Sequence, residues 1–249
     1  MEEDIRQLQK RFEELAARAD GRGRYTYTQF LTLAEQDVLQ TISRQLAAPF
    51  VWMGGYEAAE RRLACFGREE DMGYAPQSPI CCLSIAPASK KFSGDLGHRD
   101  FLGSLMALGI KRQLLGDIQI VDGVGYLFCL EEIAPYLCEN LISVGRTTVH
   151  CEPCEAPDQL SQPPEPTEVV VASERLDALI AAVWRLSRSQ AQELLERGMV
   201  FIDGRLVESP SHTLREGDTV SVRHQGRFRY EGTLRETKKG RLRVCVRIW

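Results

Sequence analysis

The sequence predicts an α+β protein built from three folded regions, and three observations predict this class. Apolar residues recur at helical spacing near the N-terminus. Strand-like and helix-like patterns follow one another in the order βαββαβ between residues 78 and 154. Two short amphipathic helices precede a hairpin signal after residue 173. A hydrophobic content of 43% is enough for buried cores. No apolar run is long enough to predict a membrane-spanning helix, so we expect no membrane partner.

Residues 1–77 are predicted to form a helical N-terminal region. Apolar residues from Ile5 to Leu15 predict one helix, a second is expected over about 32–46, and a short third over 57–62. The charged N-terminus does not have the pattern of a secretory signal, so we expect a cytoplasmic protein. Its eight cysteines are accordingly expected to be reduced core thiols.

Residues 78–154 are predicted to form a ferredoxin-like domain. Strands are expected over 80–86, 117–121, 125–130 and 144–151, with helices over 98–109 and 131–141. That is the split βαβ order, which many RNA-binding domains share, although fold alone does not give function. Tyr126 and Phe128 on the third strand could stack on bases, but core packing is the favoured interpretation. Four basic residues flank the first helix: His98, Arg99, Lys111 and Arg112. They are either ordinary helix-end charges or a second RNA-contact patch.

Residues 155–172 are rich in proline and acidic residues, which predicts a linker that does not fold alone. Beyond it, residues 173–249 predict a small domain of two helices and a sheet. Ser187 and Gln190 form a capping-box signature for the second helix, and Asp203-Gly204 predicts a tight hairpin. Polar residues off the apolar stripes are expected to point outward: Arg175, Arg188, Gln192 and Arg197. Such a set suits phosphate binding, and a solvated charged face explains it equally well.

Charge is unevenly distributed along the chain. Residues 173–249 hold 15 Lys and Arg against 10 Asp and Glu, whereas the rest of the chain holds 16 against 25. From residue 223 onward the count is 9 basic against 2 acidic residues. Seven of these nine basic residues lie on two predicted strands, 228–236 and 241–248, or on the turn between them. This density favours phosphate contact over mere protection of a sheet edge.

The motif order of the C-terminal region resembles the S4 RNA-binding domain. The matching residues are Arg175-Leu176-Asp177, Ser187-Arg188, Ala191 to Gly198, Val200 to Gly204, Pro210-Ser211 and Gly217-Asp218. Asp203 stands where that family often has Asn, and either residue suits the turn.

A wider resemblance, over nearly the full chain, is to the YlmH-type S4-domain proteins of bacteria. It is carried by GGYEAAERR at 54–62, residues 98–118, VGRTTV at 144–149, and residues 175–191 and 227–246. It implies an RNA-binding protein of the large ribosomal subunit that contacts rRNA, with tRNA as a second candidate, in the rescue of stalled nascent chains. The expected RNA-binding residues are Arg175, Ser187, Arg188, Gln192, Arg197, Arg227, Arg229, Lys238, Lys239 and Arg241.

Three motifs of the sequence resemble catalytic or metal-binding motifs, but each lacks a residue or a context that the chemistry needs. The letters HRD at 98–100 resemble a kinase catalytic loop, but Leu105 stands where that loop needs Asn. Arg175-Leu176-Asp177 also resembles a motif of some pseudouridine synthases, yet Asp177 lies inside a predicted helix, where an ion pair or cap is expected. His150, Cys151 and Cys154 have metal-like spacing without a fourth ligand.

We therefore predict a protein that is not an enzyme and has no cofactor, no metal and no DNA partner. The alternative is an RNA-modifying enzyme that uses the C-terminal domain for targeting and the His98 cluster for chemistry. A protein–protein adaptor that uses the acidic N-terminal region is compatible with RNA binding.

Overall fold

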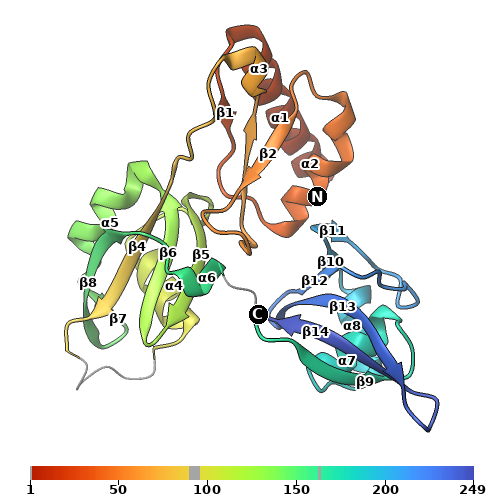
Figure 1. The fold of residues 1–249 in the computed structure, drawn as a ribbon. Helices are drawn as coiled ribbons and strands as arrows, with labels where there is room; N and C mark the ends of the chain where they lie inside the picture. Colours follow the sequence, from red (N-terminus) through yellow and green to blue (C-terminus); the bar gives the residue numbers. More distant parts are fainter. Residues whose placement is uncertain (1, 90–95, 162–163) are drawn as a thin grey trace. The chain divides into compact units, whose positions relative to one another are not determined.

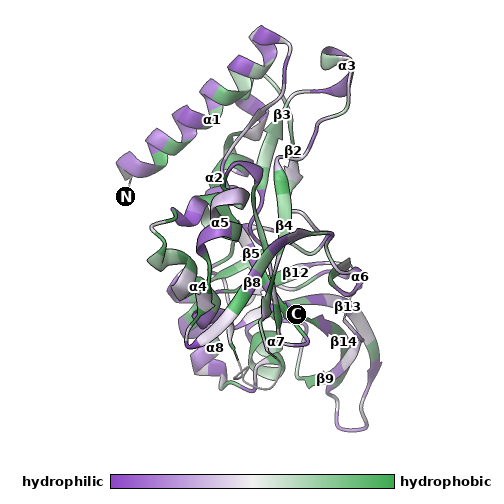
Figure 2. Ribbon diagram, turned by 90° about the vertical axis from the view of Figure 1, so that its left-hand side faces the viewer, coloured by the Kyte–Doolittle hydropathy of each residue, from purple (hydrophilic) through white to green (hydrophobic). Residues whose placement is uncertain are grey.

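The computed structural model describes residues 2–89, 96–161 and 164–249, and Figure 1 shows their elements. The chain divides into two compact units, Met1–Gln162 and Pro163–Trp249. Both combine helices with antiparallel sheets, so the predicted α+β class is confirmed. Among the described residues, no helix combines the length and the apolar character that a membrane span requires. The long helix α1, Glu2–Arg22, is largely hydrophilic in Figure 2, with apolar residues on the side that packs inward.

The N-terminal part of the first unit contains a sheet that the sequence analysis did not predict. Helices α1 and α2 cover three strands in the order β1-β3-β2, and Phe12, Leu39 and Phe66 lie in their shared core. The region predicted as helical therefore also contains a three-stranded sheet, which corrects that prediction. The elements after α1 are β1 (Thr26–Tyr27), α2 (Leu33–Ile42), η1 (Ser43–Gln45), β2 (Phe50–Met53), β3 (Leu63–Phe66) and α3 (Glu69–Met72).

The helix expected over residues 57–62 is also wrong, because this segment is the turn region that joins β2 to β3. The amides of Glu60 and Arg61 donate hydrogen bonds to the carboxylate of Asp117, distant in the sequence. Those amides are therefore directed at another segment and do not form a helical hydrogen-bond ladder.

The second part of the unit has the predicted ferredoxin-like topology. Its strands lie in the order β5-β6-β4-β8-β7, so β6 separates β4 from β5 and β4 separates β6 from β8. Each helix thus connects two parallel strands with a third between them, which is the split βαβ arrangement. Helices α4 and α5 pack on one face through Phe101, Leu105 and Leu137. The elements are β4 (Ile80–Pro87), α4 (His98–Ala107), η3 (Arg112–Leu114), β5 (Leu115–Val121), β6 (Val124–Leu130), η4 (Glu131–Ile133), α5 (Ala134–Asn140), β7 (Ser143–Val144), β8 (Thr147–Cys154) and α6 (Asp158–Ser161).

The C-terminal unit is a six-stranded sheet in the order β11-β10-β12-β13-β14-β9, with α7 and α8 packed on one face. Asp203 and Gly204 both have positive φ, as the predicted hairpin turn requires. The elements are β9 (Thr167–Val171), α7 (Leu176–Val183), α8 (Arg188–Glu196), β10 (Val200–Ile202), β11 (Arg205–Leu206), β12 (Thr219–Val222), β13 (Gly226–Glu236) and β14 (Leu242–Ile248).

Strand β9 corrects the predicted linker, since residues 167–171 belong to the sheet and pair with β14. Val171 is buried and Val169 packs against the same core, so an alternating pattern is present within the acidic stretch. The partner that makes this short run a strand lies more than 70 residues away, as in the pair formed by Val171 and Leu242. For that reason local composition did not reveal it.

Candidate nucleic-acid interface

The start of α7 is held by the loop that precedes β12. Arg175 is the N-cap residue and makes no side-chain cap. Instead the amide of Leu176 donates to the carbonyl of His212 at 2.8 Å, and that of Asp177 donates to the carbonyl of Pro210 at 3.4 Å. The first amides of a helix have no hydrogen-bond partner within the helix, and here two of them donate to backbone carbonyls of the loop. This fixes the direction in which the side chain of Asp177 leaves the helix.

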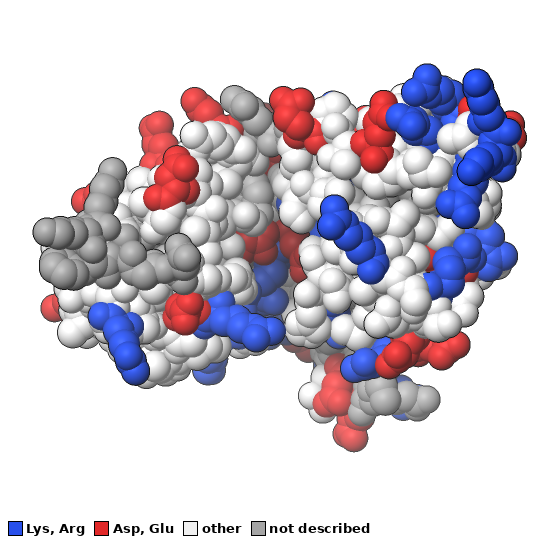
Figure 3. All heavy atoms as spheres, turned by 90° about the horizontal axis from the view of Figure 1, so that it is seen from below, with Lys and Arg blue, Asp and Glu red and all other residues white. Residues whose placement is uncertain are grey.

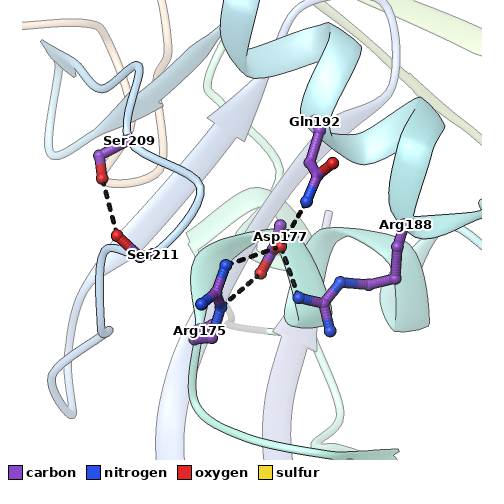
Figure 4. Close-up of polar contacts among 6 residues, drawn as sticks. All are labelled: Arg175, Asp177, Arg188, Gln192, Ser209 and Ser211. Carbon is purple, nitrogen blue, oxygen red and sulfur yellow. Dashed lines mark hydrogen bonds and ion pairs between the residues drawn. The ribbon is translucent and has the colours of Figure 1, made fainter.

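Asp177 is completely buried and collects polar side chains from both helices (Figure 4). Arg175 donates from Nε at 3.2 Å and from Nη2 at 3.3 Å, and Gln192 donates from Nε2 at 3.1 Å. Arg188 donates from Nη2 to the same carboxylate oxygen, Oδ2, that receives the amide of Gln192. We call these four residues, Arg175, Asp177, Arg188 and Gln192, the Asp177 cluster.

Local sequence explains why the four residues meet. Arg188 and Gln192 are four positions apart on α8, so their side chains lie one turn apart on the same face. Ser187 caps α8, with its hydroxyl accepting from the amide of Gln190 and the side chain of Gln190 accepting from the amide of Ser187. The predicted capping box is thus confirmed. It places Arg188 at the first helical position, where it faces α7.

Burial by itself raises the pKa of Asp177, but the hydrogen bonds from Arg175, Arg188 and Gln192 and the charge of Arg188 outweigh burial and lower that pKa. The carboxylate is therefore ionised at neutral pH. It faces two guanidinium groups, so the cluster keeps a net positive charge. The Arg175 and Arg188 side chains are 42% and 45% exposed, and a guanidinium carries five N–H donors. Each can hold Asp177 and still present donors to an anion at the surface.

This geometry corrects the expectation that Arg175, Arg188 and Gln192 simply point outward. They point toward a buried carboxylate, and the ion pair predicted for Asp177 is confirmed. Arg197 is outside the cluster and pairs with Glu193 on the exposed side of α8 at 3.4 Å. The hydroxyl of Ser187 is used in the helix cap.

Two exposed hydroxyls in the loop that holds the start of α7 were not among the predicted site residues. Ser209 and Ser211 lie 3.1 Å apart, Oγ to Oγ, in the loop whose Pro210 carbonyl accepts from Asp177. Figure 4 shows them on the same side of α7 as Arg175. The Pro210-Ser211 motif was the available signal, but it does not by itself reveal that this loop folds back onto the helix start.

Two of the predicted basic residues of the tail, Arg227 and Arg229, lie on the other face of the sheet. Phe228, Tyr230, Val244 and Val246 are buried against the helices, so alternate residues of β13 and β14 face away from them. Arg229 stands directly opposite Arg247, and Arg235 opposite Arg243. Like charges in such positions repel, and here carboxylates reduce the cost. Glu231 pairs with Arg229 and Arg247 at 3.7 and 3.3 Å, and Glu168 pairs with Arg243 at 2.7 Å.

Arg227 lies over the ring of Trp249, 5.0 Å from its centroid, near the start of β13, a strand that lies between β12 and β14 in the sheet. Arg235, Arg243 and Arg247 were not among the expected RNA-binding residues, although Arg247 is opposite Arg229 and Arg243 is opposite Arg235 on β13. Their spacing along each strand was the signal that could have found them. The expected RNA-binding residues are thus divided between the helix side, the opposite face of the sheet and the turn after β13.

The turn after β13 carries the most accessible basic side chains among those predicted for the tail. Lys238, Lys239 and Arg241 are exposed and line an open hollow together with Val170 and Thr237. Within the described part of the chain, no carboxylate forms an ion pair with any of the three. Figure 3 shows Lys and Arg side chains gathered at one end of the C-terminal unit, on the right of that view.

In the first unit, one residue of the predicted second RNA-contact patch, Arg112, has a structural role. The guanidinium of Arg112 donates to the carbonyls of Leu115 at 2.7 Å and Gly116 at 3.0 Å. Its burial lowers the pKa of Arg112 to about 10. Burial, followed by the charge of Arg112, lowers the pKa of His98, so His98 is neutral at pH 7. His98, Arg99 and Lys111 are exposed, and RNA contact by this patch stays a prediction.

The GGYEAAERR segment has a structural role. Asp117 accepts from the hydroxyl of Tyr56 at 2.8 Å and from the amides of Glu60 and Arg61 at 2.7 and 3.1 Å. Tyr56 stacks on Phe128 with centroids 4.8 Å apart, and Phe128 is buried, which confirms core packing for that aromatic residue. Gly55 has φ +89°, and a Cβ there would lie 2.4 Å from the Phe128 ring. These contacts join the N-terminal sheet region to the ferredoxin-like part.

Among the residues that the structure describes, no group of three or more His, Cys, Asp or Glu side chains could hold a metal ion. His150, Cys151 and Cys154, whose spacing had suggested a metal site, are among these described residues.

Comparisons with known proteins agree with this arrangement. Residues 80–158 match a family model described as "Putative RNA-binding domain in YlmH", and residues 174–220 match the S4 domain. The chain is 33% identical over 224 residues to Ribosome-associated protein quality control protein P2 of Bacillus subtilis, covering 89% of this chain and 86% of that protein.

Two further similarities are partial. Small ribosomal subunit protein uS4 of Staphylococcus aureus is 33% identical over 58 residues, or 23% of this chain and 29% of that protein. A solved structure of cell division protein ylmH from Streptococcus pneumoniae covers 61% of this chain and 91% of that chain, with a TM-score of 0.49 and 19% identity. The near full-length Bacillus relative and the two domain matches together show that this chain belongs to the YlmH family of S4-domain proteins.

Proposed function

We propose that this protein binds structured rRNA of the large ribosomal subunit, and the tRNA held there, during quality control of stalled nascent chains. The Asp177 cluster carries the proposal. It holds two partly exposed guanidiniums in fixed positions on adjacent helices, within the region that matches the S4 domain. Planar guanidiniums suit phosphate recognition, and fixing them in advance lowers the entropy cost of binding.

The relative's name supports the cellular setting, since that protein is described as ribosome-associated and as part of quality control. The match of residues 80–158 to a model described as an RNA-binding domain supports RNA contact by the ferredoxin-like part as well. The arginines of β13 and β14 and the turn at Lys238 add positive charge on another face, where they would bind phosphates without reading bases. On this proposal the protein acts by binding and catalyses no reaction.

The competing RNA-modification hypothesis needed His98 and its basic neighbours as a reactive group. Arg112 instead donates to two backbone carbonyls, which argues against its use in chemistry. A His98→Ala variant is therefore expected to bind RNA as the wild type does and to change no nucleotide. A loss of modified nucleotides without a loss of binding would favour the enzyme.

Sedimentation with purified ribosomal subunits tests the main proposal. Wild-type protein is expected to sediment with large subunits and not with small ones. The Arg175→Ala, Arg188→Ala double variant should bind at least tenfold more weakly, because it removes both guanidiniums of the cluster. Arg18→Ala is the matched control, since Arg18 is an exposed arginine on α1 in the other unit. Circular dichroism establishes that each variant is folded.

Alanine is preferable to a charge reversal at Arg188, because a glutamate there would place a second carboxylate beside buried Asp177.

Wild-type binding should also weaken with salt, each bound phosphate adding roughly −0.7 to −0.9 to the slope of log affinity against log salt. Equal binding by the double variant and the wild type, with both folded, would remove the cluster from the interface.

A further inference from the structure

The ferredoxin-like part contains cysteines in facing positions on its central strand. Cys81 on β4 is directly opposite Cys129 on β6, with the two Sγ atoms 3.5 Å apart. Its chain neighbour, Cys82, is directly opposite Cys154 on β8, with Sγ atoms 3.6 Å apart. All four are free thiols. Successive residues of a strand point to opposite faces, so the two pairs lie on opposite sides of the sheet.

Both pairs have a backbone arrangement that a disulfide can span. Directly opposite residues of an antiparallel ladder have Cα atoms about 4.5 to 5.5 Å apart. Disulfides accept Cα separations of about 4.4 to 6.8 Å, with an S–S bond of about 2.05 Å. Closing the gap between Cys81 and Cys129 therefore takes a shift of roughly 1.5 Å between sulfurs, which side-chain rotation can supply.

The two pairs differ in the environment of their thiols. The hydrogen bond with Cys129 lowers the pKa of Cys81 by more than burial raises it, and Cys81 is only partly buried. Cys129 is fully buried, and its hydrogen bond with Cys81 and its burial raise its pKa. Within this pair, Cys81 is therefore the thiol that loses its proton more readily. On the other face, burial and then the charge of Cys154 raise the pKa of Cys82. A partly exposed thiolate is the form that attacks oxidants.

We propose that Cys81 and Cys129 form a peroxide-oxidised dithiol, in which Cys81 reacts first and Cys129 closes a disulfide between β4 and β6. The Cys81 thiolate attacks one oxygen of hydrogen peroxide, the O–O bond breaks, and the departing oxygen leaves as water after taking a proton. Cys81 is then a sulfenic acid. The Sγ of Cys129 loses its proton and attacks the Sγ of Cys81, and the S–O bond breaks to release a second water.

In total, two thiols lose two electrons and two protons, and one peroxide becomes two waters. The bridge would join the first and third strands of the domain covalently across their ladder. The site is in the first unit, whereas the Asp177 cluster is in the second. The proposal is therefore independent of RNA binding by the Asp177 cluster, and either can fail without the other.

The test is oxidation of the folded full-length protein with a small excess of hydrogen peroxide, followed by alkylation of free thiols, digestion and mass spectrometry. We expect a peptide pair linked through Cys81 and Cys129 that dithiothreitol separates. It should form at least tenfold faster than any link between Cys82 and Cys154. The melting temperature of the first unit should rise on oxidation and return on reduction.

Cys81→Ser should abolish both the linked peptide and the temperature shift, while Cys82→Ser, its neighbour on the same strand, should leave both unchanged. Cys129→Ala tests the partner position and should also abolish the linked peptide. If this buried substitution unfolds the domain, the peptide mapping of the wild-type protein decides the proposal. The proposal is overturned if peroxide leaves Cys81 and Cys129 free to be alkylated. It is also overturned if Cys81 is converted to sulfinic or sulfonic acid without any linked peptide.

Discussion

Two aspartates, one in each unit, collect hydrogen bonds from distant residues but with opposite consequences. Asp117 is 9% exposed and accepts from two amides and a tyrosine hydroxyl. Asp177 is 0% exposed and accepts from two arginines and a glutamine. The donors to Asp117 are neutral, so its interactions only join segments. Two donors to Asp177 are charged and reach solvent, so the same kind of buried acceptor positions cations at a surface. Burial of a carboxylate therefore does not by itself present cations at a surface, whereas charged donors that reach solvent do.

The largest effect should follow from Asp117→Asn. An amide cannot accept all three hydrogen bonds, and its NH₂ group would face a backbone donor. We expect the free energy of unfolding of the first unit to fall by about 3–5 kcal/mol. Hydrogen exchange followed by mass spectrometry measures each unit separately. Tyr56→Phe, which removes one donor and keeps the ring against Phe128, should cost only about 1 kcal/mol. Equal losses in the two variants would contradict the assigned role of Asp117.

Asp177→Asn should weaken both folding and RNA binding. Its arginine partners can turn to water, so we expect a loss of about 1–3 kcal/mol in the second unit. RNA affinity should fall about fivefold to tenfold even though the protein gains a positive charge, because the guanidiniums lose their fixed positions, worth about 1 kcal/mol. Glu193→Gln on α8 makes the same change of charge outside the cluster. If both variants bind RNA more tightly than the wild type, charge alone matters and positioning does not.

The dependence of the unfolding free energy on pH, in the acidic range, gives a finer test of the Asp177 cluster. The folded-state pKa of Asp177 is below its ordinary value. Such a group contributes stability that is present above the unfolded-state pKa of about 4 and is lost as pH falls through the folded-state pKa. The difference in unfolding free energy between wild type and Asp177→Asn should be constant from about pH 5 to 7 and shrink below about pH 4. A difference that grows on acidification would have the wrong sign.

The smallest effect on folding is expected at the turn after β13. Replacing Lys238, Lys239 and Arg241 by alanine should change stability by less than about 0.5 kcal/mol, since substitutions of exposed side chains outside ion pairs have little effect on folding. RNA affinity should fall a few-fold, and the salt slope should become shallower by roughly 0.7 to 0.9 for each phosphate that the variant no longer binds. Fluorescence titrations at several salt concentrations measure both quantities. An unchanged slope would show that the turn does not contact RNA.

Much of the fold could be predicted because its signals are local. The capping box at Ser187 and Gln190, the Asp203-Gly204 hairpin and the βαββαβ order each depend on residues close together in the chain. The N-terminal sheet and β9 could not be predicted in the same way. Strands such as Thr26–Tyr27 and Thr167–Val171 are short, and each becomes a strand only through pairing with a distant one.

The sequence by itself determined which residue types were available for RNA contact, since the excess of arginine and the S4 motifs are properties of composition and order. Only the tertiary structure decided what each arginine does. Arg112 is held by two carbonyls and Arg188 by a buried carboxylate, and Arg229 is on a sheet face opposite the helices. The physical reason is that a guanidinium binds whichever acceptor the fold brings within about 3 Å, and that acceptor can come from a distant part of the chain.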